Sequence, residues 1–217
     1  MNDINNNPKA IFFIIVGMSV FAIQDTLIKL ISDKTNIFLI YLIRSMIGII
    51  LVSLFVKIRK QKIIFKTYYP KITILRCTTF FIAFSLYYVS LVKLSFALAA
   101  TLFFVSPFFI SIFSSVLLKE TVGLKRWSAV IIGFFGVYLV MNPSFENFNF
   151  YTLLPIFCAF FYALTMILQK KYSKDTLFSQ TLHLYIGALF FSSLLGIFIG
   201  NGQYNNYQDI ALEFILR

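Results

Sequence analysis

Residues 37–56 read IFLIYLIRSMIGIILVSLFV, a stretch of 20 residues in which Arg44 is the single charged side chain. An α-helix needs about 20 predominantly apolar residues to cross the roughly 30 Å hydrocarbon core of a bilayer. A surface helix of a soluble protein would show a polar face, and this stretch has none. It therefore predicts a membrane-spanning helix and, with it, the class of fold.

Similar apolar stretches recur on both sides of this one, at residues 10–31, 72–92, 95–118, 127–141, 153–169 and 179–199. Seven spans predict an all-α multi-pass membrane protein. The stretch at 127–141 is the shortest and reaches full length only if Arg126 and Asn142 lie at the interfaces. An eighth apolar run begins at Ile210 and continues to Arg217. The first run is too long for a signal peptide and lacks a small-residue cleavage site.

The composition supports the membrane assignment and excludes other classes. The chain has 217 residues, of which 59% are hydrophobic and 12% charged, against about 25% charged in soluble domains. Its net charge of +11 does not indicate a nucleic-acid partner, because the basic residues lie in short gaps between apolar stretches. Cys77 and Cys158 lie inside apolar stretches without a CxxC spacing, so we expect no disulfide, no metal site and no cofactor.

The distribution of basic residues predicts the orientation, because Lys and Arg accumulate in cytoplasmic loops. With the N-terminus inside, the inner segments hold 13 of them and the outer loops hold only Lys34 and Lys93. We therefore expect a protein of the bacterial cytoplasmic (inner) membrane with a cytoplasmic N-terminal tail at residues 1–9.

Weak internal similarity suggests two repeats. Residues 10–142 hold the first five spans, the polar residues 143–152 form an outer linker, and residues 153–217 begin a second repeat. Phe21-Ala22, Lys29 and Ser32 recur at a constant offset as Tyr162-Ala163, Lys170 and Ser173. An offset of five spans is odd, so the second copy would enter the membrane upside down, as in many secondary transporters.

Three ionisable residues lie well inside the predicted spans: Asp25, Lys29 and Arg44. Each costs about 2.5–3.5 kcal/mol at the centre of a spanning helix, so each needs a reason to be there. Asp25 and Arg44 fall at matching depth on adjacent helices, which predicts an ion pair shared with Lys29. Such a cluster either lines a solute cavity, together with Gln24, or joins the first two helices while Lys29 reaches the interface.

Other polar and small residues have a functional and a structural interpretation. Pro107 removes a hydrogen bond in mid-span and predicts a kink, with Thr101 and Ser106 beside it as candidate cavity residues. Of Tyr87 and Tyr88, we expect one to reach a solute and the other to face lipid.

Four further residues point to structure rather than to solute contact. We expect Arg76 to reach the inner interface by snorkelling. Glu120 is expected in an interfacial ion network with Lys119, Lys125 and Arg126. Gly133 and Gly136 are expected to allow close helix packing.

One group of motifs carries a family resemblance. Residues 98–102 (Leu-Ala-Ala-Thr-Leu), Ser106-Pro107, residues 117–120 (Leu-Leu-Lys-Glu), Arg126-Trp127 and residues 133–137 (Gly-Phe-Phe-Gly-Val) resemble the fourth and fifth helices of an EamA domain of the drug/metabolite transporter (DMT) superfamily. Gln24, Asp25, Lys29 and Arg44 resemble the opening of that domain, most of all in members that take up riboflavin or S-adenosylmethionine. The resemblance implies ten helices in two inverted five-helix repeats, with both termini inside.

The resemblance also implies a secondary transporter that moves a small organic solute by alternating access. The chain stops three helices short of the family pattern, so we expect either a fragment or a chain that completes itself as a homodimer. The alternative is a membrane scaffold or partner subunit that moves nothing. An enzyme is not expected, because the sequence has no nucleophile elbow and its one histidine cannot form an HExxH site. The solute, the direction of transport and the coupling ion stay open.

Overall fold

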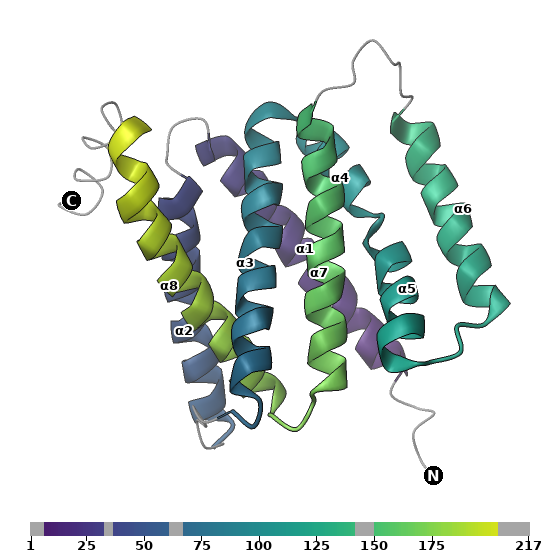
Figure 1. Cartoon of the computed structure of the whole chain (residues 1–217), viewed down its shortest axis with the longest axis horizontal. Helices are drawn as coiled ribbons and strands as arrows, with labels where there is room; N and C mark the ends of the chain where they lie inside the picture. The colour runs from purple at the N-terminus through teal and green to yellow at the C-terminus, as the bar shows by residue number, and fades with distance from the viewer. Residues whose placement is uncertain (1–6, 33–36, 61–66, 142–149, 204–217) are drawn as a thin grey trace.

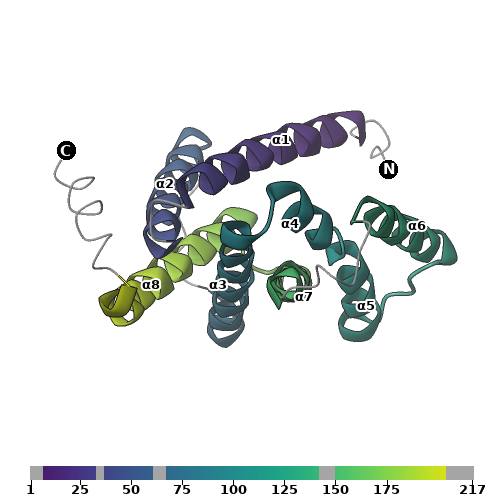
Figure 2. The same ribbon diagram turned by 90° about the horizontal axis from the view of Figure 1, so that it is seen from above.

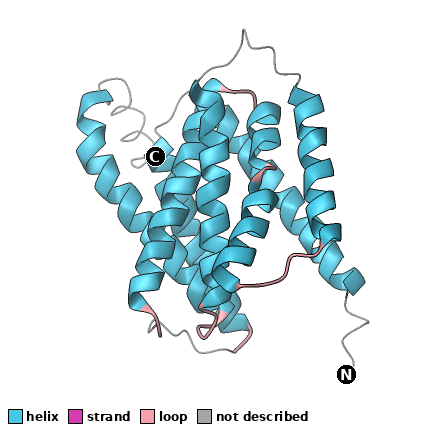
Figure 3. Ribbon diagram, turned by 45° about the vertical axis from the view of Figure 1, so that its right-hand side comes forward, coloured by secondary structure: helices cyan, strands magenta, loops and turns pink. Residues whose placement is uncertain are grey.

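The computed structural model describes residues 7–32, 37–60, 67–141 and 150–203, which are almost entirely helical and hold no strand (Figure 3). The helices are α1 Asn7–Ser32, α2 Ile37–Ile58, α3 Pro70–Lys93, α4 Phe96–Phe103, α5 Ser106–Leu118, α6 Leu124–Met141, α7 Leu153–Lys171 and α8 Leu177–Gln203, with a 3₁₀ turn, η3, at Phe150–Thr152. Each of the seven predicted spans is helical. The fourth is broken into α4 and α5.

The multi-pass membrane fold is confirmed. Among the described residues, five segments are long and apolar enough to cross a bilayer: Phe38–Ile58, Pro70–Lys93, Phe96–Leu118, Phe150–Lys171 and Leu177–Leu195. Helix α6 adds a shorter apolar helix, Trp127–Gly136. The predicted eighth run from Ile210 and most of the linker lie outside the described residues, and the division into repeats stays a prediction.

The helices run alternately up and down (Figure 1). Helices α1, α3, α6 and α8 begin at the end drawn at the bottom, which we call the basal end, whereas α2, α5 and α7 end there. Helix α7 therefore runs opposite to α1, as an inverted arrangement requires. Lys57 near the end of α2, Lys119 directly after α5 and Lys170 near the end of α7 therefore lie at this basal end, which the sequence assigns to the cytoplasm.

Helices α3 and α7 lie side by side at the centre (Figures 1 and 2). Helix α2 packs along α8 on one side, α5 packs against α7 on the other, and α1 crosses over α3 and α4. Large apolar side chains such as Val20, Ile50 and Ile132 are exposed on the outer faces. An apolar outer surface around a helical bundle suits hydrocarbon, where all backbone groups must be satisfied within the helices.

Two glycines allow close helix contact, and they are not the two that the sequence suggested. A Cβ at Gly187 of α8 would lie 2.5 Å from the Cβ of Cys77 on α3, and one at Gly48 of α2 would lie 2.6 Å from the Tyr185 ring. A Cβ at Gly133 or Gly136 would meet nothing within 4 Å. The expectation of close packing at Gly133 and Gly136 is therefore wrong, because no described neighbour comes close enough to either residue to exclude a Cβ.

This difference predicts unequal effects of the same substitution. Gly187→Ala should lower the stability of the bundle by about 1–3 kcal/mol, since the Cys77 Cβ is fixed to the backbone and cannot move aside. Gly133→Ala should be neutral or slightly stabilising, since alanine forms helix more readily than glycine. Apparent Tm values in detergent check this, and equal Tm values for the two variants would contradict it.

Candidate functional site

The break between α4 and α5 follows from Pro107. Proline has no N–H, so the Phe103 carbonyl loses the donor that a continuous helix would provide four residues later. Helix α4 ends at Phe103 and α5 begins at Ser106, while the Phe104 N–H donates to the carbonyls of Ala100 and Thr101, both at 3.2 Å. The interruption that the sequence predicts is confirmed, and it falls just before the proline.

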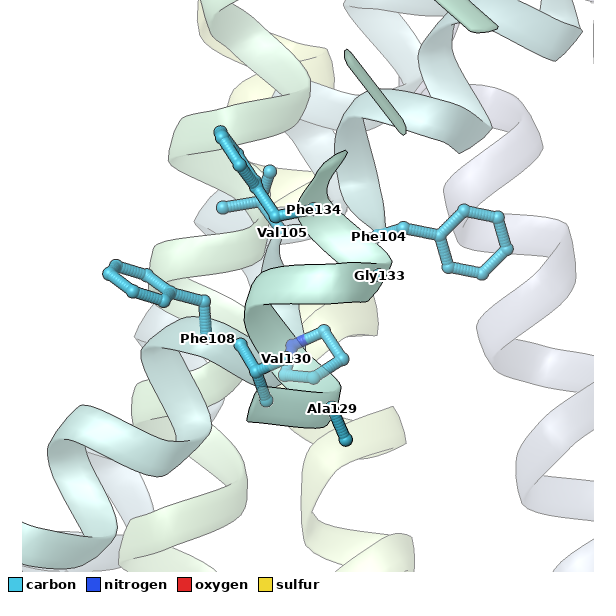
Figure 4. A pocket seen from close by; sticks show the side chains of 8 residues that line it. Phe104, Val105, Phe108, Ala129, Val130, Gly133 and Phe134 are labelled. Carbon is cyan, nitrogen blue, oxygen red and sulfur yellow. The ribbon is translucent and has the colours of Figure 1, made fainter. Parts of the chain in front are cut away.

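The break borders an apolar groove against α6 (Figure 4). The groove measures about 400 Å³ and is lined by Phe104, Val105, Pro107, Phe108, Ala129, Val130, Gly133 and Phe134. None of these side chains is charged or polar. Pro107 therefore lines a surface suited to hydrocarbon, and it does not join the ionisable residues described next.

Asp25, Tyr41, Arg44, Tyr87 and Tyr88, which we call the central cluster, come together from α1, α2 and α3. Asp25 is 2% exposed. Arg44 donates a hydrogen bond from Nη1 to the Tyr88 hydroxyl. Three rings surround the same guanidinium, with centroids at 4.8 Å (Phe84), 5.7 Å (Tyr88) and 6.0 Å (Tyr41). Such cation–π contacts are worth about 2 kcal/mol when desolvated, so the rings hold the arginine in place.

The predicted direct ion pair between Asp25 and Arg44 is wrong for this conformation. The positive charge of Arg44 acts on Asp25, and the Tyr87 hydroxyl lies beside the carboxylate, but Asp25 Oδ1 has no hydrogen-bond partner. Arg44 is turned toward Tyr88 instead, because the aromatic rings fix its plane. The two charges share a site without touching.

Lys29 bonds to a backbone carbonyl near the end of α3. Its Nζ donates to the Leu91 carbonyl in the last turn of that helix. The last carbonyls of a helix have no intrahelical partner and carry partial negative charge, which a lysine compensates. This contact connects α1 to α3, so Lys29 has a structural role whatever else it does.

Several buried polar atoms at this level of the bundle lack a partner. They are Gln24 Nε2 and Asp25 Oδ1 on α1, and the Tyr41 hydroxyl on α2. A buried polar group left unpaired costs about 1–3 kcal/mol, so native proteins rarely tolerate several together without a reason. The three atoms offer a donor, an acceptor and a group that can be either. They are suited to polar groups that the described chain does not supply.

Aromatic rings from four helices enclose this region. Phe21 of α1 contacts Phe84 of α3 at 6.2 Å, and Phe103 of α4 contacts both Tyr87 at 5.7 Å and Tyr162 of α7 at 5.3 Å. Tyr87 and Tyr88 are both buried, so the expectation that one faces lipid is wrong. Tyr87 meets Phe103 of α4, and Tyr88 meets Tyr41 and Arg44 of α2, so different helices cover the two neighbouring residues.

Sequence reasoning missed five residues that the fold brings to the cluster: Tyr41, Phe84, Phe103, Cys158 and Tyr162. The chain is rich in Phe and Tyr, so an aromatic residue does not by itself indicate a site, because most such residues are expected to face lipid. One signal was present, because Tyr41 lies three residues before Arg44 and Phe84 four before Tyr88, which places each pair on one helix face.

The remaining predicted residues lie elsewhere. Ser106 is buried and Thr101 half-buried at the helix break. Glu120 forms an ion pair with Lys170 of α7 at 2.6 Å and accepts a hydrogen bond from Ser114 at 2.6 Å, which joins α5 to α7. Arg76 does not snorkel: it is 3% exposed, because the turn between α7 and α8 lies close to it.

The EamA-like transporter family matches residues 8–142, more than half of the chain. The chain belongs to the EamA-like transporter family.

Curated relatives of this EamA protein are named as transporters. It is 34% identical over 111 residues to the riboflavin transporter of Vibrio cholerae. That alignment covers 51% of this chain and 37% of the relative. It is 24% identical over 224 residues to the S-adenosylmethionine uptake transporter of Rickettsia prowazekii, covering 100% of this chain and 73% of the relative. The match to the Rickettsia bellii protein of the same name is 27% over 158 residues, covering 70% of this chain and 52% of the relative.

The chain thus spans about a third to about three quarters of the length of these relatives. No solved structure matches it.

Proposed function

We propose that this EamA protein moves a small organic solute across the cytoplasmic membrane by alternating access, with its N-terminus inside and the central cluster as the solute site. The observation that carries the proposal is the pair of buried, unpartnered polar atoms beside the caged Arg44, Asp25 Oδ1 and the Tyr41 hydroxyl. A polar cluster that only held the helices together would be expected to pair its own donors and acceptors. A solute-binding site leaves some of its polar atoms unpaired and fixed in position until the solute binds.

The chemistry of the cluster favours a planar, ring-bearing solute with a carbonyl or anionic group. The rings of Phe84, Phe103 and Tyr162 provide faces and edges for stacking. Arg44 can donate two parallel hydrogen bonds to a carboxylate or a single one to a carbonyl, and Asp25 can accept one from an N–H group or balance a positive charge. Riboflavin and S-adenosylmethionine, the solutes in the names of the relatives, each carry a planar heteroaromatic ring system.

Uptake by the purified chain in proteoliposomes tests the proposal. We expect labelled riboflavin or labelled S-adenosylmethionine to accumulate above the level of empty vesicles, saturably and in competition with the unlabelled compound. Both compounds and a panel of other planar metabolites should be tried with the vesicles loaded and unloaded. If none of them enters above background, the transporter proposal fails, and the alternative of a membrane scaffold or partner subunit that moves nothing is favoured.

A further inference from the structure

Two turns at the basal end are hydrogen-bonded to each other. Asp175, in the turn between α7 and α8, accepts from Thr67 Oγ1 at 2.5 Å on one carboxylate oxygen and from the Tyr68 backbone N–H at 3.1 Å on the other. Thr67 also hydrogen-bonds Thr73 in the first turn of α3, at 3.0 Å. Asp175 therefore connects the start of α3 to the α7–α8 turn, with both carboxylate oxygens engaged.

Ring contacts strengthen the same connection. Tyr69 and Tyr172 meet edge to face with centroids 5.0 Å apart, and Lys174 Nζ lies 5.9 Å from the Tyr69 ring centroid. We call the contacts of residues 67–69 with residues 172–175 the basal latch. Its two hydrogen bonds join residues 107 and 108 positions apart in the chain, so the latch forms only when the start of α3 and the end of α7 approach each other.

A polar stripe on α3 leads from the latch toward the central cluster. The polar residues Thr73, Arg76, Thr79 and Tyr87, with the small apolar Ala83 between the last two, recur every three or four residues. This spacing places them on one face of the helix, and all are buried. Thr79 hydrogen-bonds Thr165 of α7 at 2.8 Å. Polar side chains therefore extend along this face from the basal latch to the Thr79–Thr165 contact, and Ala83 separates them from Tyr87 of the central cluster.

Arg76, one turn above the latch, is buried with part of its hydrogen-bonding capacity unused. Its Nε and Nη2 atoms have no partner, and these two donors form one edge of the guanidinium fork, the geometry that a carboxylate fits. Asp175 lies within electrostatic range but is held by the latch. The buried Oε1 of Gln180, whose Nε2 donates to the Asp175 carbonyl, is also unpaired.

We propose that Asp175 exchanges between the basal latch and the open edge of Arg76. In the conformation described, Thr67 and Tyr68 hold Asp175 and the basal end of the α3–α7 seam is closed. When the two turns part, Asp175 pairs with Arg76 Nε and Nη2, and the seam opens to the basal side. Each state leaves a different set of donors unpaired, so neither is strongly preferred. The proposal rests on the proposed function, since only a transporter needs such an opening.

The native cysteines allow a test that needs no solute. Cys77 and Cys158 are the two cysteines of the chain, and Cys158 lies 1% exposed beside the central cluster. In a Cys77→Ser background, the readout is the rate at which a membrane-impermeant methanethiosulfonate cation modifies Cys158 from the basal side of oriented vesicles.

The two members of the exchange should act in opposite directions. Thr67→Val removes a bond made only in the closed state and should raise the modification rate about three- to tenfold, as expected for one lost hydrogen bond. Arg76→Gln removes the partner used only in the open state and should lower the rate by a similar factor. Thr67→Ser, which keeps the hydroxyl, should restore the original rate.

Glu120→Gln is the matched control, because it breaks the Lys170 ion pair at the same end without touching the latch, and it should leave the rate unchanged. Rates that shift in the same direction in Thr67→Val and Arg76→Gln, or that shift in neither, would overturn the exchange. Because no solute takes part, these results are independent of the uptake assay. If the chain takes up solute normally and Cys158 is modified at the parent rate in the latch variants, the exchange proposal fails and the proposed function stands.

Discussion

An Asp25→Asn variant should lose at least about 100-fold in the initial rate of solute uptake while it still inserts and purifies as a folded protein. Asparagine keeps the shape of the side chain and removes its charge. Hydrogen bonds to charged groups contribute about 1.5–3 kcal/mol, and the loss of the charge that balances Arg44 adds to that. Uptake into proteoliposomes, normalised to the amount of reconstituted protein, measures the effect.

Thr26→Val is the control for this variant. Thr26 is the next residue of α1, its side chain is exposed, and its hydroxyl bonds the Ala22 carbonyl of its own helix at 2.9 Å. Its replacement should leave uptake within about twofold of the parent chain. If Asp25→Asn also transports normally, Asp25 serves only to hold α1 against α2 and α3, and the solute site must lie elsewhere.

The second large effect is expected from Arg44→Lys, a substitution that conserves charge. Lysine cannot present a planar fork or lie flat among Phe84, Tyr88 and Tyr41, so both the geometry toward the solute and the aromatic cage are lost. We expect the KM for uptake to rise about 10- to 100-fold, the factor that corresponds to about 1.4–2.8 kcal/mol of binding.

Arg59→Lys makes the same chemical change at an exposed position just beyond α2. There the guanidinium lies 5.3 Å from the Phe55 ring centroid. If the loss of a cation–π contact at any site were enough to weaken solute binding, the KM for uptake would rise in both variants. We expect only Arg44→Lys to show this rise, and a normal KM in Arg44→Lys would remove Arg44 from the site.

The spans could be predicted from the sequence because membrane insertion imposes a length and an apolarity on each helix separately. The interruption at Pro107 followed in the same way, from one missing N–H. The grouping of Asp25 with Arg44 also followed, since a short hairpin fixes the relative depth of two adjacent helices.

The contacts within the site could not be predicted, because they depend on helices far away in the chain. Nothing near Arg44 in sequence indicates that Tyr88 and Phe84 of α3 take the guanidinium from Asp25. Arg76 looked like an interfacial residue because its depth in α3 was known but the returning α7–α8 turn was not. Small residues mislead in the same manner: Gly187 packs tightly and Gly133 does not, although both are helical glycines between apolar neighbours.

Solute protection of Cys158 tests the central claim most directly. In the Cys77→Ser chain, a hydrophilic thiol reagent should reach Cys158 from water, and saturating riboflavin or S-adenosylmethionine, whichever is transported, should slow that reaction several-fold. The protection should disappear in the Asp25→Asn chain. A Cys158 thiol that reacts from neither side, or that reacts at the same rate with and without the transported solute, would contradict a solute site among these charges.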